Sequence, residues 1–339
     1  MIKDYQHTQT AHCENGVVTG LLKHKGLDFL TEPLAFGLGS GILYIHIPFL
    51  KVNGGPAISF RTLPGAIFNR TCKALEIDLV RKKFTNVEKA QAFLDQKLAE
   101  GTPVGSQVGV FHLSYFPKEY RFHFNAHNII VYAKDGDTYN ISDPVMEEVT
   151  TLTVDELNKV RFAQGVLAPK GHLYYPKGDQ LSVDKATIQK GIIKGIKRSV
   201  NDMLHIPGPV IGTRGMGYTA NKIIKLRDKL GPKRAGLFLG QIVRMQEEIG
   251  TGGGGFRFLY AAFLEEASEY LQDERLIPIA DQITKAGDLW RNSAMQMAGI
   301  YKGRITEQKD FVESANMMRE IAALEKEAFT KLGKLKLKY

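Results

Sequence analysis

The stretch "HNIIVYAKDGDTYNISDP", residues 127–144, carries the strongest β-hairpin signal in the chain. Two runs rich in β-branched and aromatic residues flank Asp135-Gly136, and an Asp-Gly pair in that position favours a tight turn. A two-residue loop at 135–136 would pair residues 128 and 143, which places His127 and Asp143 on opposite faces. A three-residue loop at 134–136, with Gly136 left-handed, would pair 127 with 143 on one face. Both loops fit the sequence, and either one predicts an antiparallel sheet.

The segments around this hairpin predict a mixed fold for the first half of the chain. "GILYIHIPFL", "GPAISFRTL" and "VGSQVGVFHL" are typical of strands bounded by Gly and Pro. Thr85 and Glu88 form the pattern of a capping box that opens a helix over residues 87–101, and Thr153 and Glu156 open another. The expected fold class is therefore α+β with an antiparallel sheet.

The second half of the chain is almost entirely helical in pattern. "YYPKGDQLS", residues 174–182, has the composition of a linker. Beyond it, apolar residues recur every four positions from Ile188 to Leu204, and further amphipathic segments follow to the end of the chain. The sequence predicts two domains, residues 1–175 and 176–339, of which the second is an all-helical bundle.

Charge is distributed unevenly over the 339 residues, whose net charge is +9. Residues 171–339 hold 27 Lys and Arg against 19 Asp and Glu, whereas residues 1–170 hold 18 against 17. The basic excess fits a solvated surface or a docking surface for an acidic carrier protein. It does not favour nucleic acid, because the lysines are not interleaved with aromatic residues in a nucleic-acid-binding motif.

Other global features restrict the class of protein. No apolar run reaches the length of a membrane span, and the N-terminus lacks the pattern of a cleaved signal peptide. The two cysteines, Cys13 and Cys72, cannot build a disulfide framework, so we expect a cytoplasmic protein in a reducing compartment. Oligomeric state is left open by the sequence.

Cys13 lies just ahead of a helical pattern in "TQTAHCENGVVTGLL", residues 8–22. A helix N-terminus or a neighbouring imidazolium favours the thiolate, which is the reactive form of a cysteine. A buried cysteine at a helix start also serves as a small apolar core residue, so position alone does not decide between the two. Cys72, inside the helical pattern "AIFNRTCKALEI", is expected in the core.

A cysteine nucleophile needs a histidine base and a third group that orients the base. His12 is adjacent to Cys13 in sequence, but consecutive side chains point apart, so it is a poor base. His127 differs from the other histidines because its predicted hairpin partner ends in Ser-Asp-Pro. A zinc site at His123 and His127 would require a helix, which this segment is not.

No cofactor is expected from the glycine-rich segments. "FGLGSG", residues 36–41, and "GTGGGG", residues 250–255, lack the lysine of a P-loop and the acid of a dinucleotide fingerprint. Both are typical of tight turns or close backbone approach, and Gly37, Gly39 and Gly41 would allow a substrate chain to pass near Cys13.

Two segments resemble a known family. "HCENGVVTGLLKHKGLDFLTEPLAFGLGSGILY" followed by "HNIIVYAKDGDTYNISDP" is similar to the butirosin biosynthesis protein H family, over roughly residues 10–175. The order of Cys, His and Asp-Pro is also similar to papain-like bacteriocin-processing peptidases. The helical remainder, especially "GGGGFRFLYAAFLEEA", resembles the uncharacterised domain that often follows.

The resemblance implies a papain-like fold and acyl transfer from an acyl carrier protein to an amine. By matching motif it assigns Cys13 as nucleophile, His127 as base and Asp143 as orienting acid. Papain-like peptidases usually carry a glutamine six residues before the cysteine, where this chain has His7, and Gln9 is out of register. The Cys13 backbone N–H is therefore the one oxyanion donor that the sequence identifies.

The resulting hypothesis is a cysteine acyltransferase of secondary-metabolite or lipid biosynthesis, with a thioester donor and an amine or alcohol acceptor. The alternatives are a papain-like peptidase or amidohydrolase, which uses water as acceptor, and a non-enzymatic binding or scaffold protein. The triad alone does not separate transfer from hydrolysis.

Overall fold

A computed structural model of the chain describes residues 5–52, 55–249 and 251–339. Its contacts divide the chain into two compact units, of which the first runs to Ala35 and resumes over Ile67–Asp184. The second, called the helical unit below, holds Phe36–Ala66 and Lys185–Tyr339. The sequence predicts residues 36–66 in the first domain, but they pack with the helical unit. The domain boundary at 175/176 stays a prediction.

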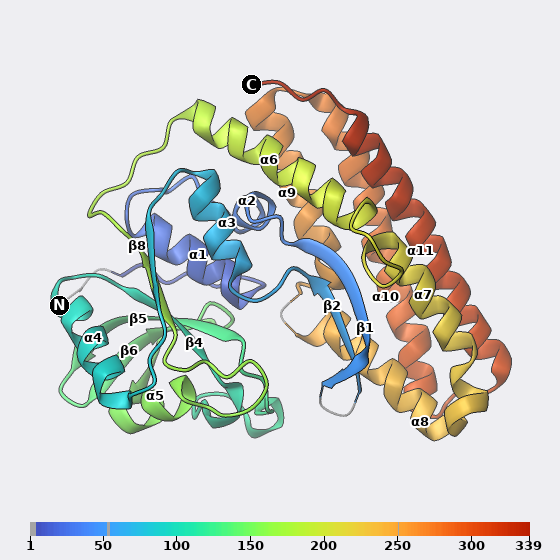
Figure 1. Cartoon of the computed structure of the whole chain (residues 1–339), viewed down its shortest axis with the longest axis horizontal. Coiled ribbons are helices and arrows are strands. Elements are labelled where there is room, and N and C mark those ends of the chain that lie inside the picture. The colour runs from blue at the N-terminus through green and yellow to red at the C-terminus, as the bar shows by residue number, and fades with distance from the viewer. Residues whose placement is uncertain (1–4, 53–54, 250) are drawn as a thin grey trace. The chain divides into compact units, whose positions relative to one another are not determined.

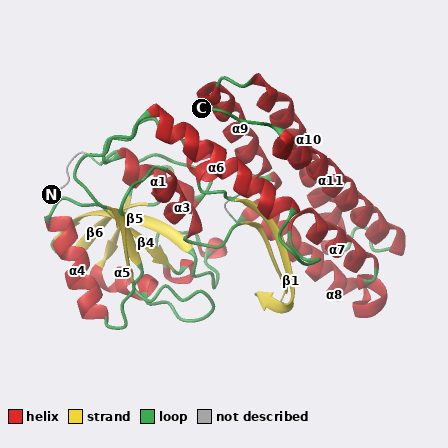
Figure 2. Cartoon of the chain, turned by 45° about the horizontal axis from the view of Figure 1, so that its top comes forward, coloured by secondary structure: helices red, strands yellow, loops and turns green. Residues whose placement is uncertain are grey.

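The first unit, called the sheet unit below, is built on a six-stranded antiparallel sheet with strand order β3-β8-β4-β5-β6-β7 (Figures 1 and 2). Its strands are β3 (Leu79–Lys82), β4 (Val104–Val108), β5 (His127–Asp135), β6 (Thr138–Ser142), β7 (Thr150–Thr153) and β8 (Leu173–Pro176). Its helices are α1 (Cys13–Lys23), α3 (Ala66–Ala74), α4 (Val87–Ala99) and α5 (Val154–Arg161), and the short α2 (Glu32–Leu38) runs across the division.

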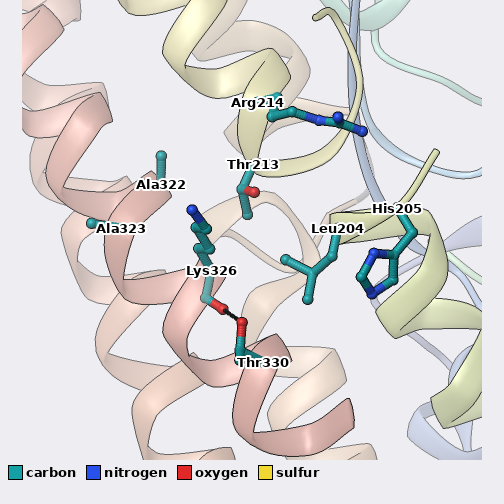
Figure 3. Close-up of a pocket in the computed structure, with 8 residues that line it drawn as sticks. All are labelled: Leu204, His205, Thr213, Arg214, Ala322, Ala323, Lys326 and Thr330. Atoms are coloured by element: carbon teal, nitrogen blue, oxygen red, sulfur yellow. Dashed lines mark hydrogen bonds between the residues drawn. The ribbon is translucent and has the colours of Figure 1, made fainter. Parts of the chain in front are cut away.

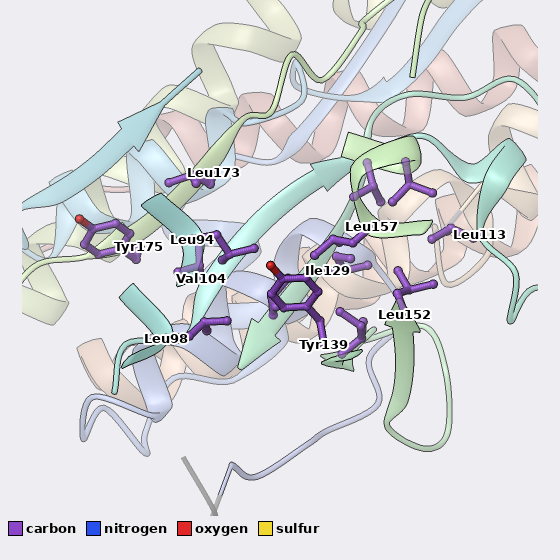
Figure 4. Close-up of a cluster of buried hydrophobic side chains, with 14 of the residues drawn as sticks. Leu94, Leu98, Val104, Leu113, Ile129, Tyr139, Leu152, Leu157, Leu173 and Tyr175 are labelled. Atoms are coloured by element: carbon purple, nitrogen blue, oxygen red, sulfur yellow. The ribbon is translucent and has the colours of Figure 1, made fainter. Parts of the chain in front are cut away.

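A continuous apolar core fills the space between this sheet and helices α4 and α5 (Figure 4). Leu94 and Leu98 contribute from α4, Leu157 from α5, and Ile129 and Tyr139 from the sheet. All five are almost completely buried. The opposite side of strand β5 packs against α1, which brings the helix that begins with Cys13 onto the sheet.

The hairpin of β5 and β6 has a register that neither predicted loop gives. Asp135 pairs with Thr138, so the loop is Gly136-Asp137, and Gly136 has the expected left-handed φ of 54°. A β-bulge at Tyr132 then shifts the register, so that Val131 pairs with Ile141 and Ile130 with Ser142. Without this bulge, residues 127 and 143 would lie on opposite faces. The added residue returns them to one face.

The helical unit contains a two-stranded antiparallel ribbon, β1 (Ile42–Val52) and β2 (Gly55–Arg61), packed on helices. The helices are α6 (Lys185–Leu204), α7 (Gly212–Ile224), α8 (Leu226–Val243), α9 (Arg257–Leu271), α10 (Ile277–Tyr301) and α11 (Gln308–Lys334), drawn in red in Figure 2. Within the described residues, no helix is long and apolar enough to cross a membrane.

The predicted fold class is confirmed: an α+β region with an antiparallel sheet is followed by a helical region. Two local predictions differ from the structure. The N-cap of α4 is Asn86, whose side chain accepts from the Lys89 N–H, so the capping box at Thr85 and Glu88 does not form. The predicted linker at 174–182 is correct only in part: residues 174–176 belong to the buried strand β8, which pairs with β3 and β4, and residues 177–182 follow it without regular structure.

Candidate active site

Cys13 is the first residue of α1 and lies at the helix N-terminus. The side chain of His12 caps this helix, because its Nδ1 accepts a hydrogen bond from the Asn15 N–H at 3.3 Å. Glu32 holds the preceding backbone by accepting from the N–H groups of Ala11, at 2.9 Å, and His12, at 2.8 Å. The first N–H groups of a helix have no acceptor within it and favour negative charge. Cys13 therefore occupies a position suited to a thiolate.

The end of strand β6 lies directly against the start of α1. The Thr10 N–H donates to the Pro144 carbonyl at 2.7 Å. A side chain at Gly16 would overlap the Pro144 ring, so only glycine allows this close approach. The Asp143-Pro144 segment and Cys13 are thus brought together by backbone contacts.

His127 connects Cys13 to Asp143. Its Nε2 lies 2.7 Å from Asp143 Oδ2, and the imidazole also hydrogen bonds to the Cys13 thiol. Since Nε2 is engaged by the carboxylate, Nδ1 is the ring nitrogen left for sulfur. All three side chains are less than 8% exposed. The structure brings together the three residues that the resemblance assigns.

The protonation of His127 depends on its two neighbours. Burial alone lowers the pKa of this imidazole, but the charges of Asp143 and Cys13, and hydrogen bonds to both, raise the pKa of His127 to about 10. The imidazole therefore holds its proton at neutral pH, beside the sulfur and the carboxylate. A proton held on this imidazole lies next to the sulfur of Cys13 and the carboxylate of Asp143.

Asp143 is completely buried and is stabilised by two further donors. The Tyr115 hydroxyl donates to Oδ2 at 2.7 Å, and the Val145 N–H donates to Oδ1 at 3.2 Å. Burial and the Asp143 charge hold the pKa of Tyr115 well above its usual value, so its hydroxyl stays a donor. Sequence reasoning missed Tyr115, because its segment has no regular pattern that would place it near residue 143.

His7 and Gln9, the residues near the usual oxyanion glutamine, contact the loop after β6. The His7 ring lies 2.8 Å from Ser142 Oγ and 3.1 Å from the Met146 carbonyl, and Gln9 Nε2 donates to Val145 O at 3.5 Å. A different amide lies at the sulfur: Asn128 Nδ2 is 3.9 Å from Cys13 Sγ. Asn128 also escaped sequence reasoning, although it follows His127 directly.

The second cysteine has a different environment. Cys72 in α3 is completely buried, and burial raises the pKa of its thiol to about 12. Its expected place in the core is confirmed, and its thiol stays protonated.

Two protein families match different parts of the chain. Residues 12–144 match the family described as "Butirosin biosynthesis protein H, N-terminal", and residues 155–332 match "Domain of unknown function (DUF4872)". The chain belongs to the butirosin biosynthesis protein H-like family. In this butirosin H-like chain the first match begins at the N-cap of α1 and ends just after Asp143, so it contains the whole Cys13–His127–Asp143 arrangement.

No curated protein sequence matches the chain. Among solved structures, a C39-like peptidase from Bacillus anthracis is similar, with 12% sequence identity, a TM-score of 0.37, and coverage of 52% of this chain and 96% of the peptidase. Among the described residues, no group of three or more His, Cys, Asp and Glu side chains converges in a way that would hold a metal ion.

The helical unit of the butirosin H-like chain has a shallow surface pocket of about 420 Å³. It is lined by His205 from the segment after α6, by Arg214 from α7 and by Lys326 from α11 (Figure 3). Thr213 and Thr330 add hydroxyl groups, and the remaining lining residues are Leu204, Ala322 and Ala323. The lining contains three basic side chains and no acidic one, which makes it a candidate contact for an anionic group.

Proposed function

We propose that this protein is a papain-like cysteine acyltransferase that forms an acyl-enzyme on Cys13. The observation that carries the proposal is the contact of His127 with both the Cys13 thiol and the buried Asp143 carboxylate. Membership of the butirosin H-like family supports a biosynthetic thioester as the acyl donor. The donor is expected to be an acyl carrier protein, and the acceptor an amine or alcohol.

The reaction has two halves. In the first, the Cys13 thiolate attacks the thioester carbon, a carbon–sulfur bond forms, and the Cys13 N–H at the helix start donates to the oxyanion. The carbon–sulfur bond to the donor then breaks, and His127 gives its proton to the departing thiolate. One thioester replaces another, so this step changes the free energy little.

In the second half, acylation itself prepares His127 to act as a base. The Cys13 charge is one of the causes that raise the pKa of His127. Acylation removes that charge, which lowers the pKa of His127, so the imidazole stays neutral after it has protonated the leaving group. It can then accept a proton from the incoming amine or alcohol. The acceptor attacks the thioester, the bond to Cys13 breaks, and the thiolate–imidazolium pair is restored.

The basic pocket of the helical unit supplies a role for that unit in the proposed reaction. We propose that His205, Arg214 and Lys326 contact an acidic carrier protein, because carrier proteins are usually acidic and the pocket lining contains basic and no acidic side chains. Complementary charge of this kind increases the rate of encounter and decreases with salt.

The test is mass spectrometry of the intact protein after incubation with an acyl-pantetheine thioester. We expect one acyl group on the native protein and on Cys72→Ala, and none on Cys13→Ala. Adding amines to the isolated acyl-enzyme should discharge it faster than buffer does and should yield the acyl amide. Acylation that survives loss of Cys13 would refute the mechanism, and discharge only to the free acid would establish a hydrolase.

A further inference from the structure

The side-chain amide of Asn128 lies beside the sulfur of Cys13, in the interior of the sheet unit. Its Nδ2 is 3.9 Å from Sγ, within hydrogen-bonding range for sulfur, and its side chain is only 3% exposed. Successive residues of a strand point to opposite faces. Ile130 lies against Gly20 of α1, so Asn128, two residues earlier on β5, also faces that helix. His127 and Asn128 therefore reach Cys13 from different directions.

Two other hydrogen bonds fix which end of this amide faces the sulfur. Nδ2 donates to the Ala126 carbonyl at 3.1 Å, and Oδ1 accepts from the Tyr174 hydroxyl at 2.7 Å. A carbonyl only accepts, so the atom facing Ala126 must be the nitrogen. An amide nitrogen has two hydrogens, so one can bind the Ala126 carbonyl while the second is available to Cys13 Sγ.

Tyr174 is held in turn by the sheet and by α3. Its ring lies over Gly105 of the neighbouring strand β4, where a Cβ would lie 2.5 Å from the ring. Phe68 of α3 packs against the same ring, with centroids 4.7 Å apart. Tyr174 is almost completely buried, so its hydroxyl presents a fixed donor to Asn128.

We propose that Asn128, oriented by Tyr174, is a catalytic residue that donates a hydrogen bond to the Cys13 thiolate. The inference rests on the proposed role of Cys13 as nucleophile and adds a second donor at its sulfur. A charged acceptor binds a donor more strongly than a neutral one, so this hydrogen bond favours the thiolate over both the thiol and the acyl-enzyme. It raises the thiolate population before attack and stabilises the departing thiolate in the second half of the reaction.

The test is the pH dependence of Cys13 alkylation by iodoacetamide, measured in a Cys72→Ala background so that one thiol remains. In Asn128→Ala we expect the alkylation rate at about pH 6.5 to fall roughly tenfold, and we expect a much smaller difference at about pH 10, because alkaline solution favours the thiolate whether or not the amide is present. Tyr174→Phe should shift the profile in the same direction by less. Asn158→Ala, which removes an amide hydrogen bond to Gln91 between α5 and α4, is the matched control and should leave the profile unchanged.

An unchanged pH profile in a folded Asn128→Ala protein would overturn the inference. If that variant does not fold, Tyr174→Phe, which keeps the amide and removes one hydroxyl, decides the question by the same measurement. The two proposals fail separately. A Cys13 that alkylates with the expected profile but accepts no acyl group refutes the acyltransferase and leaves the Asn128 contact standing.

Discussion

The sheet unit and the helical unit each bury an ion pair, and the two pairs have different surroundings. In the helical unit, Arg257 of α9 binds both oxygens of Glu325 of α11, at 2.8 and 2.9 Å. Trp290 of α10 donates to the same carboxylate at 2.7 Å, and Arg257 also donates to the Gly255 carbonyl. In the sheet unit, His127 Nε2 contacts Asp143, and the same imidazole hydrogen bonds to the Cys13 thiol.

This difference is the one expected between a structural ion pair and the reactive pair that we propose at Cys13. Buried charges are costly, and both pairs offset the cost with short hydrogen bonds. Every partner of the Arg257–Glu325 pair is itself a fixed element of the fold, so the pair joins three helices. In the His127–Asp143 pair, the imidazole can gain or lose a proton, and its neighbour Cys13 has a thiol that can change its charge. Breaking the first should affect folding, and breaking the second should affect chemistry.

The largest effect is expected for His127→Ala. The rate of acyl-enzyme formation should fall about 10³-fold, or about 4 kcal/mol in activation free energy, because the thiolate loses its counter-charge and the leaving group its proton donor. Trp290, the single tryptophan, reports unfolding of the helical unit by its fluorescence, which should not change. The control is His123→Ala, which alters an exposed ring stacked on Phe111. A loss of less than tenfold would contradict the assigned base.

Glu325→Gln is expected to reduce stability, in contrast to His127→Ala, which is expected to reduce the reaction rate. Removing the carboxylate charge leaves the Arg257 guanidinium buried without a counter-ion, which should lower the free energy of unfolding by about 3–5 kcal/mol. Denaturant unfolding followed by Trp290 fluorescence measures the change where it occurs. Glu327→Gln, which alters an exposed pair with Lys331 on the same helix, should leave the transition unchanged. Equal transitions in the two variants would show that the buried pair does not stabilise the helical unit.

Asp143→Asn should change the pH dependence of the reaction. In the native protein His127 keeps its proton until about pH 10, so the acylation rate should fall only above that pH. Burial lowers the pKa of His127, and the Asp143 charge opposes it, so the variant should lose activity at a lower pH. We also expect a fall in rate of about 10²-fold at neutral pH. Asp155→Asn, at an exposed position of α5, is the control. If the pH at which the rate falls is the same in Asp143→Asn as in the native protein, Asp143 is not the orienting acid.

Sequence periodicity was sufficient to predict the helices and strands but not the contacts between them. The hairpin, the helical second half and the start of α1 follow from local patterns, and so does "GTGGGG", whose glycines 252–255 all have positive φ. The hairpin register depends instead on the bulge at Tyr132, whose ring stacks on Tyr5 at 4.8 Å. Such a contact between distant residues has no local signature.

The candidate site was also predictable only in part. Its Cys, His and Asp were assigned by resemblance to the family, since spacing alone left two registers open. Tyr115 and Asn128 contact site residues that lie 28 and 115 positions away, respectively, so no pattern in their own segments marks them. The packing of residues 36–66 with the helical unit likewise includes contacts between distant residues, such as Phe36 stacked on Phe256 with ring centroids 5.3 Å apart.

The smallest effect is expected for charge reversal in the basic pocket. In the double variant Arg214→Glu and Lys326→Glu, acylation by a loaded carrier protein should fall about tenfold at low salt, because exposed charges act mainly on encounter. Acylation by acyl-pantetheine, which has no protein surface, should stay the same. Reversal of Lys334 and Lys336, exposed near the C-terminus, controls for net charge.

The comparison of the two donors distinguishes docking from chemistry. If the pocket contacts the carrier, the difference between native and variant should diminish as salt increases, since exposed charges more than about 10 Å apart are screened at 0.1 M. If the acylation rate falls equally with the carrier protein and with acyl-pantetheine, the substitutions act on the reaction at Cys13. If it falls equally in the Arg214/Lys326 and Lys334/Lys336 double variants, the effect comes from net charge. Either result would remove the carrier-binding role of the pocket and leave the acyl-enzyme mechanism intact.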